Sequence, residues 1–398
     1  MQAPDLTNPD AAAQLKILQA GAAPLYIVRP DILPLALLAM ARLTFTYGRS
    51  PIGAYALSTY GLLLAGHFGE IADGYAFAKA AIDLNAVLDD AQFRGAILHI
   101  FGIHVSFWKE HYDVSTPLLQ SAFNDCAKVG DLEYGNYIGF QLSFNLWEKG
   151  DALHGLFAAT APYLAFAKRS GAAHVAATIE FEHIALRYLQ DEETLAPRLN
   201  QEAQKHLQTL QDSLFKAGEG YCTVMGLGVA HILGDDACAL QWLEKFLARS
   251  DVLLSTPAQL SGWFYAALCL ARDYPNLQGA KQAETLRQIE AIAGRFARWA
   301  AAYPDNAAAR AALLHAEVAR LQGRVSTALQ YFEEARLAAI AGKFMHIEAL
   351  ANEMAAGLYA TLHIDKVALM HIHEAHRIYL QWGALHKVSR MQSRYPEL

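Results

Sequence analysis

Apolar residues recur at helical spacing through nearly the whole chain. They lie three and four residues apart in stretches of about 15 to 20 residues, and Gly, Pro, Asp or Asn interrupts each stretch. Alternating runs typical of strands are rare, and hairpin turns of the Asn-Gly or Asp-Gly type do not separate apolar runs. The pattern therefore predicts an all-α fold of short helices joined by tight turns.

The ends of these helices are indicated by capping residues. Many stretches begin near a side-chain acceptor or a small residue, and several end near glycine. The expected helices are residues 31–47, 50–67, 69–88, 90–110, 114–129, 131–149, 151–169, 172–188, 197–216, 219–233, 235–248, 257–271 and 279–302.

The last third carries a repeat signal. Ala328, Phe332 and Ala335 have the small–aromatic–small spacing of the second helix of a tetratricopeptide unit, and an equivalent set, Ala368, Ile372 and Ala375, follows 40 residues later. The usual period is about 34 residues, so these units are longer. Such a unit cannot bury its apolar face alone and must stack on its neighbours. We therefore expect a right-handed, tetratricopeptide-like α-α superhelix (solenoid) of roughly nine helix hairpins with a concave groove.

The series is least regular between about residues 190 and 218, where an acidic break precedes a Gln-rich helix. We therefore expect three regions: N-terminal helical repeats over 1–189, less regular middle repeats over 190–300, and tetratricopeptide-like repeats with a capping helix over 301–398.

Composition narrows the class of protein. Hydrophobic residues make up 54% of the 398 residues, but much of this is alanine, which favours closely stacked helices. No stretch approaches the roughly 20 apolar residues that span a membrane, and the N-terminus lacks a secretory signal pattern. The net charge of −7 disfavours nucleic-acid binding. The four cysteines form no CxxC pair, which indicates free thiols in a cytoplasmic protein without a metal or other cofactor.

Several stretches, found in the right order along the chain, resemble the helical-repeat region of very large bacterial signalling proteins. Those proteins join a serine/threonine-kinase-like domain, a STAND-type ATPase, this repeat region, a GAF domain and a sensor histidine kinase. The resemblance is carried by residues 15–18, 23–26, 33–34, 47–51, 60–62, 66–70, 108–111, 130–134, 299–300, 316–317, 348–353, 382–384 and 395–396. It implies a role in signal transduction. The P-loop and kinase motifs of the family do not occur in this sequence, so the resemblance implies no enzymatic activity for it.

One candidate binding stripe lies in the expected helix 90–110 and the turn after it. His104, Trp108 and His111 are spaced four and three residues apart, so they would share one helix face, and Phe101 flanks them. A tryptophan anchor with imidazole handles is typical of a surface that binds a ligand or peptide. The alternative is that Trp108 packs between repeats and that the histidines are held in internal hydrogen bonds.

A second candidate strip lies in the expected helix 131–149. Tyr134, Tyr137 and Phe140 begin an aromatic series at spacings of three and four, continued by Phe144 and Trp147. An aromatic series of this kind is most often part of a core. On the concave face it would instead be the best binding strip of the chain.

Catalytic and metal sites have weaker support. Glu180 and His183 could form an acid/base pair on one helix face, and the histidines at 363, 371, 373 and 376 crowd the last repeat. A solvated polar face explains the first set more simply, and isolated polar histidines on a helix explain the second.

The sequence therefore predicts a non-catalytic sensor or protein-interaction module of a bacterial signalling system. It would bind a partner segment, a flanking signalling domain or a small ligand in its concave groove, and transmit the change by bending, since each repeat of a solenoid contacts only its neighbours. The alternatives are a self-association scaffold acting as a homodimer and, with less support, a metal-dependent enzyme.

Overall fold

The computed structural model describes residues 4–29, 31–190 and 196–398, and within these ranges it contains helices and no β-strand. The α-helices are α1 (Pro9–Val28), α2 (Leu33–Tyr47), α3 (Pro51–Leu62), α4 (Ile71–Leu88), α5 (Arg94–His99), α6 (Tyr112–Val129), α7 (Leu132–Glu148), α8 (Leu153–Arg169), α9 (Ala173–Gln190), α10 (Ala196–Asp212), α11 (Lys216–Leu233), α12 (Asp236–Leu247), α13 (Pro257–Asp273), α14 (Gly279–Ala302), α15 (Pro304–Leu321), α16 (Val325–Ala341), α17 (Met345–Thr361), α18 (Asp365–Trp382) and α19 (Leu385–Arg394).

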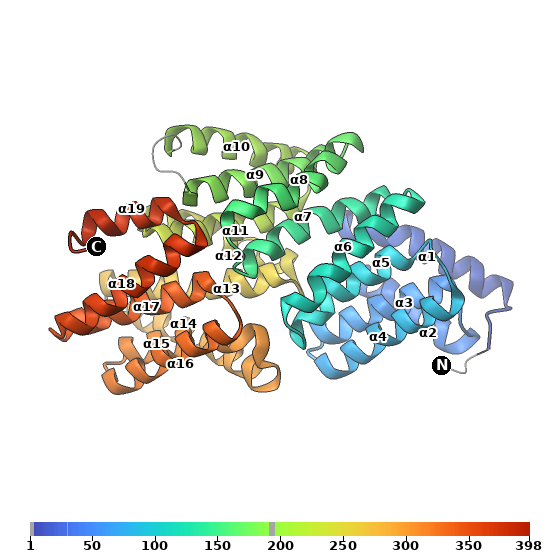
Figure 1. Cartoon of the computed structure of the whole chain (residues 1–398). Helices are drawn as coiled ribbons and strands as arrows, with labels where there is room; N and C mark the ends of the chain where they lie inside the picture. Colours follow the sequence, from blue (N-terminus) through green and yellow to red (C-terminus); the bar gives the residue numbers. More distant parts are fainter. Residues whose placement is uncertain (1–3, 30, 191–195) are drawn as a thin grey trace.

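Helices that follow one another in sequence pack together as hairpins, and alternate helices also contact each other, as α9 does with α11 and α13 with α15. The array winds as a superhelix, with α1 to α6 at one side of Figure 1 and α13 to α19 at the other. The predicted all-α solenoid is confirmed. The repeat positions behave as expected, because Ala328, Phe332 and Ala335 are buried between helices. No helix in the described ranges is long and apolar enough to cross a membrane.

One helix, α1, precedes the first predicted helix, 31–47. Helix α1 begins at Pro9, which occupies the first helical position, and the Asn8 side chain accepts a hydrogen bond from the Ala11 amide at 2.9 Å. This is a favourable arrangement for a helix start. The described part of α1 packs against α2 and α3.

The helix expected over 90–110 is only partly correct. α5 ends at His99, a π-helical segment follows over Ile100–Val105, and a 3-10 turn covers Ser106–Trp108. Gly102 lies so close to α6 that a Cβ atom there would be 2.8 Å from the Leu119 side chain. π-Helical segments are rare and are found disproportionately at functional sites.

Successive turns of the superhelix also contact each other. Helix α19 packs against α9 and α11, and α7 packs against α13. The turns contact each other through hydrogen bonds between residues more than 140 positions apart, such as Trp108 with Ser255 and Trp382 with Asp151. The expectation that each repeat contacts only its neighbours is therefore wrong for this chain, because the superhelical turns are in direct contact.

Candidate functional site

The aromatic strip of α7 lies on the inner side of the superhelix. Asp131 caps this helix by accepting a hydrogen bond from the Tyr134 amide at 3.1 Å. Tyr134 and Tyr137 are half-buried, whereas Phe140 is buried, with ring centroids 5.5 Å from Phe215 and 5.1 Å from Tyr221. The predicted strip therefore divides into two partly accessible tyrosines and a core phenylalanine.

His99, which the sequence did not single out, joins the two candidate strips. Its ring centroid lies 5.5 Å from those of both His104 and Tyr134, and 6.5 Å from that of Tyr137. Tyr55 of α3 completes the group, because its hydroxyl lies 2.7 Å from the Tyr134 hydroxyl. We call these five residues, Tyr55, His99, His104, Tyr134 and Tyr137, the inner aromatic cluster.

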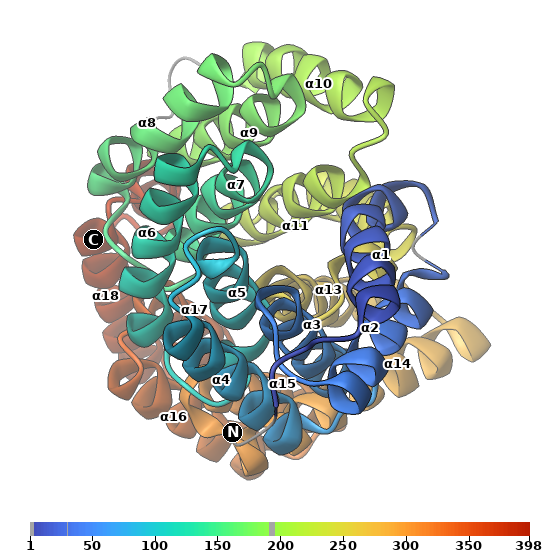
Figure 2. The same ribbon diagram turned by 90° about the vertical axis from the view of Figure 1, so that its right-hand side faces the viewer.

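Tyr26 of α1 lies close to the cluster. Tyr26 keeps 38% of its surface exposed, yet the atoms around it raise the pKa of its hydroxyl to about 12 by desolvation. Tyr26 is also close enough to Tyr137 and Tyr221 to raise the pKa of each. In Figure 2, α1, α3, α5, α7 and α11 surround the centre of the view.

The charged residues that perturb this cluster are acidic. Burial is the main cause of the raised pKa values of Tyr55, Tyr134 and Tyr137. Asp131 and Glu133 raise those of Tyr55 and Tyr134 further, and Glu133 also raises that of Tyr137, whose hydroxyl donates to it at 3.3 Å. Desolvation in turn raises the pKa of each carboxyl group. The surroundings of the cluster therefore carry negative potential.

The predicted common face of His104, Trp108 and His111 is wrong. The π-helical and 3-10 segments change the spacing, and His111 lies outside the helix as the N-cap of α6. Phe101 is buried, with its ring 5.5 Å from that of Tyr75. Trp108 and His104 instead make the internal contacts that the alternative interpretation expected. Trp108 Nε1 donates to Ser255 Oγ and His104 Nδ1 donates to the Ser255 carbonyl oxygen, both at 3.0 Å.

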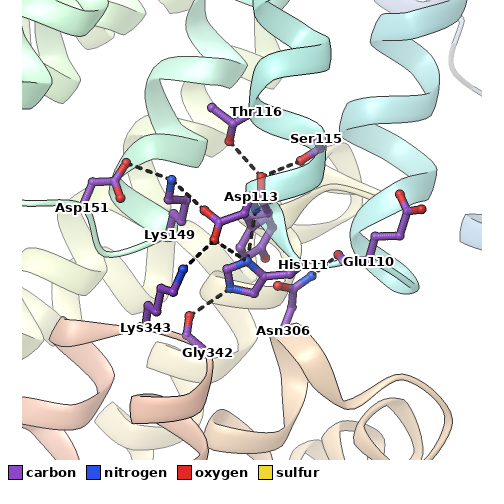
Figure 3. A network of polar contacts seen from close by, with 11 residues as sticks. Glu110, His111, Asp113, Ser115, Thr116, Lys149, Asp151, Asn306, Gly342 and Lys343 are labelled. Atoms are coloured by element: carbon purple, nitrogen blue, oxygen red, sulfur yellow. Dashed lines mark hydrogen bonds and ion pairs between the residues drawn. The ribbon is translucent and has the colours of Figure 1, made fainter.

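His111 belongs to a polar joint between superhelical turns, drawn in Figure 3. Its Nδ1 accepts from the Asp113 amide at 3.1 Å, and its Nε2 donates to the Gly342 carbonyl oxygen at 2.9 Å. The Asp113 carboxylate pairs with Lys149 at 2.9 Å and Lys343 at 3.4 Å, and the hydrogen bond from Lys149 lowers its pKa. The joint connects α6, the end of α7 and the turn before α17.

Asn306 makes a second connection between turns, and its loss is expected to be costly. Its Nδ2 donates to the carbonyl oxygens of Phe107 and Glu110, each at 2.8 Å, and the residue is buried. Asn306→Ala leaves both carbonyl oxygens without this donor, so we expect a loss of about 1–3 kcal/mol in the free energy of unfolding by denaturant. The control is Asn276→Ala, which removes an exposed hydrogen bond. Equal stability of the two variants would contradict this role.

Stability is expected to fall in acid through the buried histidines. Desolvation lowers the pKa of His99 and His183 to about 4 and that of His104 to about 3, from an ordinary value of 6.5. These groups are neutral in the folded state and bind protons more readily when unfolded, so stability present above pH 6.5 is lost as the pH falls toward 4. Denaturant unfolding measured at intervals across this range checks the slope. His99→Gln should reduce the slope, and an unchanged slope would contradict the assignment to His99.

The residues considered for catalysis or metal binding have other partners. Glu180 pairs with Lys168 at 2.6 Å, whereas His183 hydrogen-bonds Thr160 at 2.6 Å, so the two do not form an acid/base pair. His371 contacts Asn352 at 2.9 Å. Within the described ranges, no three His, Cys, Asp or Glu side chains are placed to hold a metal ion.

Comparison with known proteins adds little. No protein-family model and no curated protein matches the chain. A solved structure described as a "Circular tandem repeat protein with novel repeat topology and enhanced subunit contact surfaces" aligns over 97% of this chain and 95% of its own, with 12% identity and a TM-score of 0.19. Similarity at this level supports no statement about function.

Proposed function

We propose that this chain is a non-catalytic helical-repeat binding module that receives a partner segment or a small ligand on its inner face. The observation that carries this proposal is the inner aromatic cluster. Two of its tyrosines, Tyr134 and Tyr137, are partly accessible, and the exposed Tyr26 lies close to Tyr137. Tyrosine provides large contact area together with a polar hydroxyl, and a rigid surface of this kind is typical of binding sites.

The resemblance to the repeat region of bacterial signalling proteins supports a place in an ATPase/kinase signalling system, next to flanking signalling domains. The contacts between superhelical turns suggest how binding is transmitted. His104 belongs to the inner aromatic cluster and also donates to Ser255 of the next superhelical turn. A ligand that moves His104 would therefore act on the contact between turns.

A thermal-shift screen of small molecules and short peptides tests the proposal. We expect ligands whose stabilising effect is lost in Tyr137→Leu and kept in Tyr47→Leu, which alters an exposed tyrosine at the end of α2. A cavity of about 340 Å³, lined by Asn85, Arg94 and Ile97 among others, offers a competing site. If the only ligands found respond to Arg94→Ala and not to Tyr137→Leu, the assignment to the inner face is contradicted.

Self-association is the second candidate, and exposed apolar side chains on α2 favour it. Leu35 and Phe45 of this helix are 66% and 54% exposed. Light scattering over a range of concentrations, on the wild type and on Phe45→Ser, separates the two candidates. A homodimer would dissociate on dilution or in the variant, whereas an unchanging monomer mass would exclude it.

A further inference from the structure

We propose that the cavity between α4 and α5 binds a free amino acid with an aliphatic side chain. This site goes beyond the proposed function, because none of the residues that line the cavity belongs to the inner aromatic cluster. Three features support the inference: the volume and apolar walls of the cavity, a buried amide oxygen without a donor, and a pair of opposite charges at its opening.

The cavity lies where α4 ends and α5 begins. Its volume is about 340 Å³, near the lower end of the roughly 300–1,000 Å³ that small-molecule pockets occupy. Both helices contribute apolar side chains to its walls, namely Ile82 and Ala86 of α4 and Ile97 and Leu98 of α5. Ile97 is 1% exposed, whereas Ile82 and Leu98 are half-buried. A short aliphatic chain in this cavity would remove apolar surface of ligand and protein from water.

Asn85 supplies a polar group inside the cavity. The residue is only 3% exposed, and its Nδ2 donates to the Asp90 carbonyl oxygen at 2.9 Å. This hydrogen bond fixes the orientation of the amide and leaves Oδ1 as the acceptor. Within the described ranges, Oδ1 has no hydrogen-bond donor, and it is not one of the partnerless polar atoms that protein covers completely. Since buried polar groups in native proteins are nearly always paired, an acceptor open to a cavity fits an N–H donor of a ligand.

Two side chains of opposite charge lie at the opening of the cavity. Arg94 and Asp89 both line it, with a guanidinium nitrogen 3.2 Å from a carboxylate oxygen. The Asp89 side chain is 93% exposed and that of Arg94 is 37% exposed, so their pairing contributes little and can be exchanged for contacts with a ligand.

A zwitterion fits these three polar groups. Its carboxylate would accept hydrogen bonds from the Arg94 guanidinium, and its ammonium group would donate to Asp89 and to Asn85 Oδ1. A ligand with only one of the two charges would also meet a like charge beside its partner. An amino acid carries both charges on adjacent groups and directs its aliphatic chain away from them, toward the apolar walls.

Calorimetric titration of the whole chain tests the proposal with leucine and two analogues that share its aliphatic chain. One analogue, 4-methylpentanoate, lacks the ammonium group, and the other, 3-methylbutan-1-amine, lacks the carboxylate. We expect leucine to bind at least about tenfold more tightly than either analogue. Glycine, which lacks the aliphatic chain, should also bind at least about tenfold more weakly than leucine.

Variants locate the binding. Asp89→Asn should weaken leucine binding and should not weaken 4-methylpentanoate binding, which needs no ammonium partner. Asp83→Asn removes the same charge from an exposed position on α4 and should have no effect. Arg94→Ala should reduce the affinity for leucine to about that for 3-methylbutan-1-amine, with a thermal unfolding profile to show that the variant is folded.

The outcomes separate this site from the inner face. Equal affinities for leucine and either analogue, equal leucine binding by Asp89→Asn and Asp83→Asn, or no leucine binding at all would overturn the inference. Tyr137→Leu should leave leucine binding unchanged. If Tyr137→Leu abolishes it and Arg94→Ala does not, leucine binds at the inner face, so this inference fails while the proposed function is supported. A thermal-shift screen without any ligand that depends on Tyr137 would instead remove the proposed function and leave the amino-acid site intact.

Discussion

Replacing Arg310 by methionine is expected to lower the free energy of unfolding by about 3–5 kcal/mol, because it leaves an uncompensated buried carboxylate. Arg310 of α15 and Glu148 of α7 are both fully buried, and the guanidinium nitrogen lies 2.6 Å from the carboxylate oxygen. The pair joins two turns of the superhelix. Removing one partner therefore weakens the contact between turns as well as the local packing.

The surroundings of the pair explain why both charges are retained. Ser261 also donates to the Glu148 carboxylate, and a second Arg310 nitrogen donates to the Asn306 carbonyl oxygen at 3.0 Å. The guanidinium lies 5.0 Å from the centroid of the Phe344 ring. Burial raises the pKa of Glu148, and the charge of Arg310 and the neighbouring hydroxyl groups oppose that rise.

Denaturant unfolding of three variants tests this assignment. Arg287→Met serves as the control, since its pairing with Glu284 is exposed and such pairs contribute at most about 1 kcal/mol. In the double variant Glu148→Met, Arg310→Met neither charge remains, so we expect it to recover part of the stability lost in Arg310→Met. If Arg310→Met costs no more than the control, the pair does not hold the turns together.

The helices could be predicted from the sequence because the signals that set them are local. Ser50 illustrates this, since its hydroxyl accepts from the Gly53 amide at 3.0 Å directly before Pro51. Thr256 caps α13 before Pro257 in the same way, at 3.2 Å. Both the cap and the proline can be recognised within four residues, whatever the rest of the chain does.

No local signal in the sequence distinguishes the π-helical segment from an ordinary α-helix. The close approach of Gly102 to Leu119 joins residues on different helices, and the apolar pattern of 90–110 is that of an ordinary α-helix. The consequence for the candidate site was large. The structure places His111 in the joint between turns and not on the predicted stripe. It places His99 in the inner aromatic cluster, although no sequence pattern indicated a role for this residue.

Contacts between turns are harder still to predict from the sequence, because they depend on the superhelical pitch and therefore on every angle between neighbouring helices. A partial signal exists for Arg310, a single charge within the alanine- and leucine-rich run 307–314. A charge on an apolar face indicates a buried partner, but nothing local identifies Glu148, 162 positions away, as that partner.

Glu182 is also a buried acidic residue, but replacing it is expected to raise the free energy of unfolding, whereas replacing Arg310 is expected to lower it. This residue of α9 is 1% exposed, and neither carboxyl oxygen has a hydrogen-bond partner in the described ranges. Desolvation raises its pKa well above the ordinary value of 4.5. Between pH 4.5 and the folded-state pKa, folding therefore requires the carboxyl group to take up a proton that the unfolded chain does not hold. Stability is accordingly lost as the pH rises from 4.5 toward the folded-state pKa.

Glu182→Gln keeps the shape of the protonated side chain and removes that cost, so we expect the variant to be more stable than the wild type at pH 7 to 8. The gain grows by about 1.4 kcal/mol for each pH unit between the unfolded- and folded-state pKa values, and it should vanish near pH 4. Denaturant unfolding from pH 6.5 to 8.5 separates this effect from the histidines, which are neutral in both states over most of that range. Glu180→Gln, on the same helix but paired with Lys168, is the matched control and should bring no gain. A Glu182→Gln protein no more stable than the wild type at pH 8 would mean that the buried carboxylate has a partner that compensates its charge.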